Sequence, residues 1–340
     1  MRAFQIERFH DDGLRLVSEC EAPSPGPGEV RLRVHAVSLN YRDLLVLKGS
    51  YAPKQPLPLV PLSDAVGVVE ALGEGVTRVA IGDRVCPSFA QAWISGEPTK
   101  ARLRSTLGSP LSGVLAEQIL VSAESLTAVA AGLSDEEAAC LPCAGVTAYN
   151  ALVSLGDLQR GDSVLVQGSG GVSLFALQIA KALGARVIAT SSSQEKLARL
   201  RALGADHVIH YREDPSWGGT ARRLAGGEGV DHVVEVGGAG TLAESLRAVR
   251  SGGVVSIIGV LGGAAAELSL LPVMMNQVRL QGVMVGPRVA LDALMSLVEK
   301  ASLAPVVDRV FPFEEAPAAF QHLRSGQHFG KVVIRVAPAS

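Results

Sequence analysis

The first 123 residues carry short apolar runs that are separated by turn residues. The segments between the runs, such as 23–29 and 72–85, are rich in proline or glycine, as is typical of turns. Runs of this length and composition predict β-strands, here at 2–7, 14–19, 29–40, 64–72, 84–89 and 113–121. The hydrophobic pattern therefore predicts a β-rich first region.

From residue 134 to about 260 the pattern changes, and apolar residues at helical spacing alternate with short apolar runs. Helices are expected at 172–183, 194–203, 217–225 and 241–249, and strands at 164–167, 186–190, 207–209, 232–236 and 254–259. This alternation predicts an α/β fold with a doubly wound parallel sheet. Nearer the C-terminus we expect a helix at 290–300, another from about 314, and a last strand at 331–336.

A glycine-rich turn stands at the start of this second region. Gly168, Gly170 and Gly171 follow its first strand, and Val172 is the first apolar residue of the next helix. Such a turn exposes backbone N–H groups and the positive end of the helix dipole, which suits a pyrophosphate. Ser173 stands where the dinucleotide fingerprint has its third glycine, and we expect it to displace the helix slightly. The strand–turn–helix context favours a dinucleotide-binding Rossmann domain over a glycine-rich turn of another doubly wound domain.

Composition and charge narrow the function. A chain of 340 residues predicts more than one domain. Lys plus Arg is 31 and Asp plus Glu is 33, a formal charge of −2, which gives no reason to expect nucleic acid or an anionic membrane as partner. The most apolar region, 254–278, is interrupted by glycines, Glu267 and Pro272, so we expect no membrane span. Four cysteines and no visible secretion signal indicate reduced thiols in a cytoplasmic protein.

Five stretches, 25–43, 66–85, 141–152, 163–193 and 329–334, together resemble the medium-chain dehydrogenase/reductase superfamily. The resemblance covers essentially the whole chain. It implies a β-rich, GroES-like catalytic domain built from residues 1–123 and 286–340, with a Rossmann domain, 124–285, inserted between them. Nicotinamide and a small-molecule substrate are then expected to bind between the two domains. The family commonly pairs its Rossmann sheets edge to edge, which implies a homodimer that meets near 278–285.

Many members of this family bind a catalytic zinc ion. The resemblance places Asn40 at the position of the first ligand, Ser63 and Asp64 at that of a His–Glu pair, and Cys143 at that of the third ligand. One thiolate without imidazole or a second thiolate does not hold such a zinc ion. The cluster of four cysteines that binds structural zinc in the family is missing too. The chain is therefore similar to the zinc-independent branch of quinone oxidoreductases and enoyl reductases, and we expect no metal.

Cys140 and Cys143 have the spacing of a redox dithiol. No thioredoxin-like unit surrounds them, so we favour two small buried residues at a turn.

The end of the second parallel strand decides between NADH and NADPH. Enzymes that prefer NAD usually place a carboxylate there, but this chain has hydroxyls at 190–193 and no carboxylate before Glu195. In similar quinone oxidoreductases, a lysine and a tyrosine at the positions of Lys196 and Tyr211 contact the 2′-phosphate. With Ser191 beside them they favour NADP(H). The alternative is that Lys196 is a solvated helix residue.

Without zinc, hydrogen-bond donors must stabilise the charge that develops during reduction. An alkene conjugated to a carbonyl delocalises that charge, whereas alcohol–ketone exchange gains more from a Lewis acid. We therefore expect NADPH to transfer a hydride to an activated, α,β-unsaturated carbonyl compound or to a quinone. Tyr51 resembles the proton donor of enoyl reductases, and the alternative is a tyrosine that only packs the loop.

The resemblance also assigns cofactor contacts. Asn40 is expected to orient the nicotinamide ribose, and Thr147 to contact the cofactor near its reactive end. Further contacts are implied for Val236, Gly259, Phe329 and Lys331. Arg42 and Asp43, if they form a pair, are expected to hold the loop after Asn40 and not to touch substrate. Two other functions stay open: a zinc-free alcohol dehydrogenase and a non-catalytic NADPH-binding protein.

Overall fold

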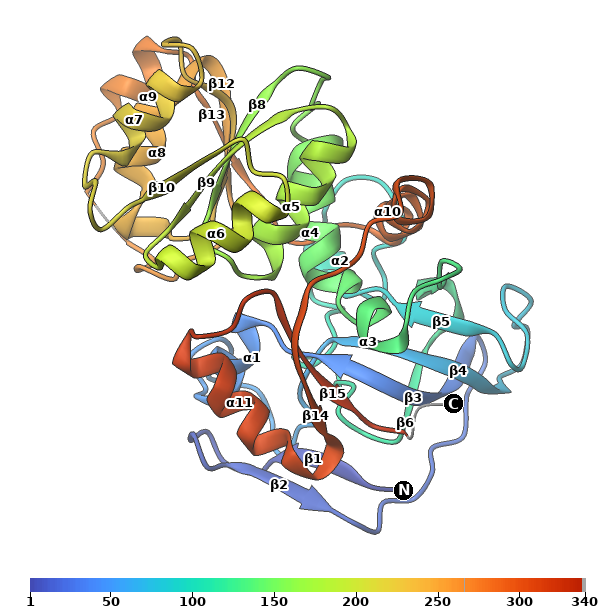
Figure 1. The fold of residues 1–340 in the computed structure, drawn as a ribbon. Helices are drawn as coiled ribbons and strands as arrows, with labels where there is room; N and C mark the ends of the chain where they lie inside the picture. Colours follow the sequence, from blue (N-terminus) through green and yellow to red (C-terminus); the bar gives the residue numbers. More distant parts are fainter. Residues whose placement is uncertain (266, 338–340) are drawn as a thin grey trace. The chain divides into compact units, whose positions relative to one another are not determined.

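The computed structural model describes residues 1–265 and 267–337 (Figure 1). Contacts between residues divide the chain into two compact units. Unit 1 is Met1–Val146 together with the chain from Gly286 onward, and unit 2 is Thr147–Val285. Within the described residues, no helix has both the length and the apolar character that crossing a membrane requires.

Unit 1 is built on a mixed sheet that joins both ends of the chain. Its strand order is β14–β15–β3–β4–β5–β7, with β6 also paired to β3, while β1 and β2 form a separate hairpin. The strands are β1 (Ala3–Ile6), β2 (Leu14–Val17), β3 (Glu29–Ser38), β4 (Asp64–Leu72), β5 (Arg84–Pro87), β6 (Gln118–Ser122), β7 (Leu126–Ala128), β14 (Val307–Pro312) and β15 (Lys331–Arg335). Because β15 pairs antiparallel with β3, the start of β15 lies beside the end of β3.

The helices of unit 1 are short except at its C-terminal part. They are α1 (Tyr41–Leu47), α2 (Lys100–Leu103), α3 (Asp135–Ala138), α10 (Arg288–Ala301) and α11 (Ala316–Ser325). A π-helical turn, Leu141–Gly145, follows α3 in the sequence. One core, which includes Leu32, Leu47 and Ile334, draws its side chains from β3, α1 and β15. The hydrophobic pattern did not predict α1.

Unit 2 is a parallel sheet of the order β10–β9–β8–β11–β12–β13. These strands are β8 (Ser163–Gln167), β9 (Arg186–Ser191), β10 (His207–His210), β11 (Val230–Glu235), β12 (Val249–Ile257) and β13 (Arg279–Gly282). Numbered along the chain, the order is that of the Rossmann fold. The α/β prediction is therefore confirmed. All five residues of β8 are buried, as expected for a central strand that is covered on both faces.

The helices of unit 2 lie on both faces of this sheet (Figure 1). α5 (Gly171–Ala182) and α6 (Gln194–Ala202) cover one face, while α7 (Trp217–Leu224), α8 (Leu242–Ala248) and α9 (Leu271–Met275) lie on the other. At the boundary of the units, α4 (Val146–Tyr149) is followed by a second π-helical turn, Asn150–Ser154.

Two segments differ from the expected arrangement. Residues 124–146, which we expected in the Rossmann domain, lie in unit 1. They are tied to its sheet, because the Ser38 hydroxyl donates to Ala139 O at 2.8 Å and His35 contacts Asp135 at 2.9 Å. The strand expected at 113–121 begins only at Gln118. Ahead of it Gly113 and Val114 bond the carbonyls of Val60 and Pro61 and not a neighbouring strand.

A buried carboxylate stands where β11 ends. Glu235 has no solvent exposure, and its two oxygens accept hydrogen bonds from the backbone N–H groups of Gly237 and Gly238 and from the side chains of Gln167, Thr241 and Ser245. Gln167 is the last residue of β8 and lies next to the glycine turn. Several donors compensate a buried charge that has no cation among the described residues.

Replacement of Glu235 by glutamine tests this network. Gln167 keeps its own oxygen toward Val236 N and Gly237 N, both at 3.3 Å, so its NH2 group would face the new amide NH2 at position 235. We expect Glu235→Gln to lower the free energy of unfolding by about 1–3 kcal/mol, the cost of an unmet buried donor. Urea denaturation measures it. Glu228→Gln, at an exposed glutamate of the same unit, is the control. If the two variants have equal free energies of unfolding, the hydrogen-bond network assigned to Glu235 is contradicted.

Candidate functional site

In unit 1 the candidate residues gather where β3 ends and β15 begins. Asn40 is the N-cap of α1, and its backbone N–H donates to Asp43 Oδ2 at 2.7 Å. A polar N-cap followed three residues later by a carboxylate is a helix-start signal, and it could have revealed α1 from the sequence. The helix therefore begins at the residue whose side chain is the candidate ligand of the nicotinamide ribose.

Lys331, the first residue of β15, is buried against this turn. It is only 4% exposed, and its Nζ atom donates to Leu39 O at 2.7 Å and to Asn40 Oδ1 at 2.6 Å. The same ammonium lies 3.8 Å from Asp64 Oδ2. A residue near the C-terminus thus supplies a fixed positive charge to a turn formed about 290 residues earlier.

Asp64 is fully buried at the start of β4. Its carboxylate accepts a hydrogen bond from the Ser63 hydroxyl at 2.7 Å and from Cys143 N at 3.2 Å. Burial raises the pKa of Asp64, and the ammonium of Lys331 is the largest opposing influence. Asn40 Nδ2 is buried and makes no hydrogen bond of adequate geometry among the described residues. A weak hydrogen bond from its amide to the Asp64 carboxylate nevertheless lowers the pKa of Asp64.

Tyr51 lies against a cation–aromatic stack. The guanidinium carbon of Arg42 is 4.8 Å from the ring centre of Tyr51 and 4.8 Å from that of Phe89. Arg42 is itself fixed, because it donates to Leu107 O at 2.9 Å and to Ser109 O at 2.6 Å. Tyr51 as a whole residue is 41% exposed. Packing and an accessible hydroxyl are thus both compatible with its position.

Arg42 and Asp43 hold the loop separately. No ion pair joins them within the part of the chain that the structure describes: Asp43 bonds the backbone of Asn40, and Arg42 bonds the segment 107–109.

The cysteine pair, Cys140 and Cys143, also has a structural role. Cys140 Sγ lies 3.1 Å from Glu136 O, and burial raises the pKa of its thiol to about 12. A protonated thiol is a poor redox group, which favours the interpretation as small packing residues.

In unit 2 the glycine turn is open on one side. Gly168 has φ +72°, which favours glycine, and a side chain at Gly168 or Gly170 would meet no atom within 4 Å. This leaves room beside the N-terminus of α5 for a ligand. Ser173, expected to displace the helix, is 2% exposed and donates from Oγ to Gln167 O at 2.6 Å. Its hydroxyl therefore bonds the helix to the end of β8.

Val236 and Gly259 lie together at the carboxyl ends of β11 and β12. A Cβ atom at Gly259 would stand 2.3 Å from Val236 O, so only glycine allows this approach. The following loops are joined by Gly262 N donating to Gly237 O at 2.6 Å. The carboxylate of Glu235 fixes the loop after β11, because it accepts hydrogen bonds from Gly237 N and Gly238 N. Ligands of parallel α/β sheets bind beside such strand ends.

The residues expected around a 2′-phosphate also lie near one another. Ser191 ends β9, and its carbonyl accepts a hydrogen bond from Tyr211 N at 3.1 Å. Lys196 is in the first turn of α6, which Ser193 caps by accepting a hydrogen bond from Lys196 N at 3.3 Å.

Two further residues expected to contact the cofactor are buried. Thr147 is buried in α4 of unit 2. In unit 1, Phe329 is buried two residues before Lys331, and its N–H donates to Asp308 Oδ1 at 2.9 Å.

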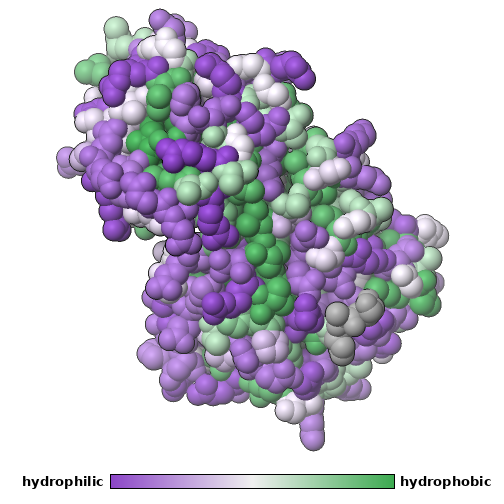
Figure 2. All heavy atoms as spheres, in the orientation of Figure 1, coloured by the Kyte–Doolittle hydropathy of each residue, from purple (hydrophilic) through white to green (hydrophobic). Residues whose placement is uncertain are grey.

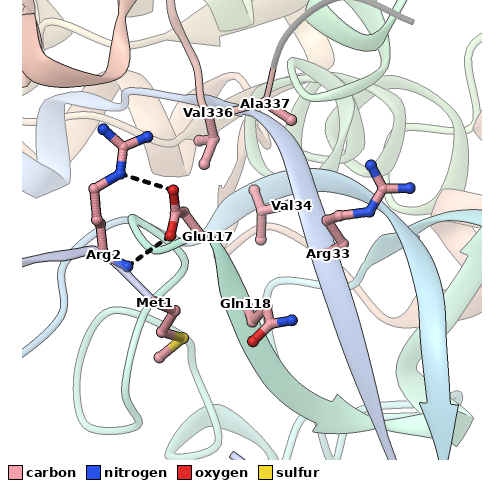
Figure 3. Close-up of a pocket in the computed structure, with 8 residues that line it drawn as sticks. All are labelled: Met1, Arg2, Arg33, Val34, Glu117, Gln118, Val336 and Ala337. Atoms are coloured by element: carbon pink, nitrogen blue, oxygen red, sulfur yellow. Dashed lines mark hydrogen bonds and ion pairs between the residues drawn. The ribbon is translucent and has the colours of Figure 1, made fainter. Parts of the chain in front are cut away.

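A pocket of about 470 Å³ lies elsewhere in unit 1 (Figure 3). It contains Val336, five residues beyond Lys331 and hence roughly 17 Å away along an extended strand. Arg2 at its edge bonds both oxygens of Glu117, at 2.8 and 2.7 Å. The pocket is thus separate from the cluster around Lys331, and we assign it no role.

The burial of Asp43 predicts a pH effect on stability. Burial raises the pKa of Asp43 to about 6, whereas its unfolded value is 3.8. The folded state then binds the proton more tightly, so this group's stabilising contribution is full below pH 3.8 and is lost as the pH rises to about 6. Compared with Asp43→Asn, the wild-type chain should lose about 3 kcal/mol across that window. Urea denaturation from pH 4 to 7 measures it, and parallel profiles would contradict it.

Comparisons with known proteins place the chain in a family. The model of the zinc-binding dehydrogenase domain matches residues 171–300, and that of the alcohol dehydrogenase GroES-like domain matches residues 26–131. A zinc-type alcohol dehydrogenase-like protein of Schizosaccharomyces pombe is 40% identical, with 94% of each chain covered. An acryloyl-coenzyme A reductase of Metallosphaera sedula is 32% identical, with 97% of this chain and 98% of that protein covered.

A crystal structure of a putative alcohol dehydrogenase from Sinorhizobium meliloti 1021 has the same fold. Its TM-score is 0.92 at 45% sequence identity, with 98% of each chain covered. Similarity extends over 94% of this chain in sequence and 98% in structure, and thus over both units. The chain therefore belongs to the medium-chain dehydrogenase/reductase superfamily and is an NAD(P)-dependent oxidoreductase with a GroES-like and a Rossmann domain.

Proposed function

We propose that the protein is an NADPH-dependent reductase that acts without zinc on a carbonyl-conjugated alkene or a quinone. The observation that carries the proposal is the buried ammonium of Lys331, which contacts Asn40 and lies near Asp64. These are positions at which zinc enzymes of the family carry ligands. Relatives named acryloyl-coenzyme A reductase, which carry an activated alkene in their name, support the same substrate class.

The donors at the zinc positions do not fit a zinc ion. Asn40 Oδ1 accepts a hydrogen bond from Lys331, whose positive charge also lies 3.8 Å from Asp64 and would repel a second cation. Cys143 is the only sulfur ligand at these positions, and one thiolate without imidazole or a second thiolate does not hold such an ion. Ser63 donates its hydroxyl to Asp64. Among the described residues, no three His, Cys, Asp or Glu side chains form a possible metal site.

The open glycine turn supports binding of the pyrophosphate. Gly168, Gly170, Gly171 and Val172 lie at or just before the N-terminus of α5, where N–H groups and the helix dipole favour an anion. Ser191, Lys196 and Tyr211 would bind the 2′-phosphate. A cation and hydroxyl groups suit a dianion there.

The remaining residues would hold the reacting end of the cofactor. Bound NADPH supplies a hydride. Val236 and Gly259 form a close-packed platform. Thr147 is buried in α4, and Phe329 is buried in the segment just before β15. Asn40 would donate from its amide to the nicotinamide ribose. Tyr51 would donate a proton to the reduced substrate, with its ring held by Arg42.

An alternative is a zinc-free alcohol dehydrogenase, because several relatives carry the name alcohol dehydrogenase. Assays in both directions, with NADP and with NAD, separate the two. We expect reduction of an enone with NADPH to be the faster reaction and elemental analysis to find no stoichiometric zinc. Absence of turnover with every enone and quinone would favour a non-catalytic NADPH-binding protein.

Lys196→Ala should discriminate between the cofactors. Loss of a charge-assisted hydrogen bond to the 2′-phosphate is expected to weaken NADPH binding by about 1–3 kcal/mol and to leave NADH binding unchanged. Fluorescence titration of both nucleotides measures it. Arg201→Ala, an exposed cation of the same helix, is the matched control. Equal weakening of both nucleotides by Lys196→Ala would show that this lysine does not bind the 2′-phosphate.

Tyr51→Phe should separate proton donation from packing. The phenylalanine keeps the contact with Arg42 but removes the hydroxyl, so kcat with an enone should fall by roughly 10²–10⁴ while cofactor affinity stays the same. A quinone serves as control, because water can protonate its reduced form. Tyr41→Phe, at an exposed tyrosine, is the control for the substitution itself. If enone reduction by Tyr51→Phe stays within a few-fold of wild type, the tyrosine only packs.

We also propose a homodimer formed through unit 2. β13 is an edge strand, and nearby Leu270, Leu271, Met274 and Met275 are 62–72% exposed. In Figure 2, hydrophobic side chains are visible at the surface of unit 2 in the region of α7 and α9. An edge strand beside an apolar surface suits pairing with an identical edge.

Light scattering at micromolar concentration tests the dimer. The wild-type chain should have the mass of a dimer, and the double variant Leu271→Asp, Met275→Asp should shift to the monomer because it places two charges in the interface. Ile81→Asp, at an exposed residue of unit 1, should remain a dimer. A monomeric wild-type chain would refute the proposal.

A further inference from the structure

We infer that Lys331 is a positioning residue that fixes the side-chain amide of Asn40 as a hydrogen-bond donor toward an acceptor oxygen of the nicotinamide ribose. The inference rests on the proposed function and deepens it. The family resemblance implies that Lys331 contacts the cofactor itself. We infer instead that Lys331 acts on the cofactor through the neighbouring side chain of Asn40.

The polarity of the Asn40 amide follows from its contact with the lysine. An asparagine amide has an acceptor end and a donor end of nearly equal shape, whereas an ammonium has three donors and no acceptor. With Nζ 2.6 Å from the amide, the oxygen must face Lys331, because the opposite orientation would set NH2 against NH3⁺. The NH2 group is therefore directed away from the lysine.

That NH2 group has no well-aligned acceptor among the described residues, since its one acceptor, the Asp64 carboxylate, is poorly placed for it. Asn40 Nδ2 is buried and makes no hydrogen bond of adequate geometry within the described residues. An unmet buried donor is costly, so this position favours a ligand that brings an acceptor oxygen. A ribose hydroxyl is such a group, and the amide can bind it only as a donor.

The lysine cannot release the amide by turning away. Its ammonium is also bonded to Leu39 O at 2.7 Å, and Asp64 lies 3.8 Å from it. Asp64 is held in turn by the Ser63 hydroxyl and by Cys143 N. The position of the lysine thus depends on contacts that do not involve the cofactor, which is what preorganisation of a binding group requires.

A double-mutant cycle tests the inference. The background is Asp64→Asn, so that removal of the lysine leaves no uncompensated buried carboxylate. Into it are placed Lys331→Met, Asn40→Ala and both together. Affinity is measured for NADPH and for adenosine 2′,5′-bisphosphate, which lacks the nicotinamide ribose, and circular dichroism checks folding. Turnover of the wild-type chain with NADPH and an enone is measured first, so that failure of the proposed function is seen separately.

We expect each single replacement to weaken NADPH roughly tenfold and the double replacement to weaken it no further, because the lysine acts through the amide. Affinity for the bisphosphate should stay unchanged. Losses that multiply, an unchanged NADPH affinity in Lys331→Met, or equal loss of both ligands would each overturn the inference.

A second variant covers the case in which the Asp64→Asn chain does not fold. Asn40→Asp in the otherwise wild-type chain keeps a partner for Lys331 and removes the N–H donor. It should weaken NADPH about as much as Asn40→Ala, again without effect on the bisphosphate. Affinity equal to that of the wild-type chain would show that the N–H group of Asn40 is not the binding element and would overturn the inference.

Discussion

Compensation of buried carboxylates is the constraint on which both halves of this protein depend. A buried charge is tolerated only with a countercharge or with enough hydrogen-bond donors. Unit 1 meets the requirement at Asp64 with the ammonium of Lys331, and unit 2 meets it at Glu235 with five neutral donors. Both solutions join segments that are distant in sequence, and both lie at strand ends where candidate cofactor residues stand. The charges that cost stability are thus also the ones that order the site.

The two solutions have different consequences for chemistry. Neutral donors around Glu235 order the end of β8 and the loop after β11 without placing a side-chain cation beside the carboxylate. Lys331, in contrast, places an ammonium group in a part of unit 1 where zinc enzymes of the family carry a metal. An ammonium orients donors but does not activate a bound oxygen as a Lewis acid does. This favours substrates whose reduction delocalises the developing charge, such as enones and quinones, over simple alcohols.

The sequence predicted what local patterns encode. Alternating short apolar runs and helical stretches predicted the parallel sheet, and the glycine turn was recognisable because its strand and helix are adjacent in the chain. The helix α1 was missed although Asn40 and Asp43 carry its start signal, because a helix of only seven residues is too short to show a clear hydrophobic period. The contact of Lys331 with Asn40, the donors of Glu235 and the stack of Arg42 join residues with no sequence periodicity between them. Such contacts follow from tertiary packing alone.

Lys331 also links the stability of the sheet to the geometry of the site. It is the first residue of β15, whose pairing with β3 sets Val333 opposite Ser38. A slip of one residue in that pairing would turn the lysine to the other face of the sheet, because side chains alternate along a strand. The register is held by buried Val332 and Ile334, which pack in the core of unit 1. Core packing at the C-terminal strand therefore determines where the ammonium stands, and through it which end of the Asn40 amide is available.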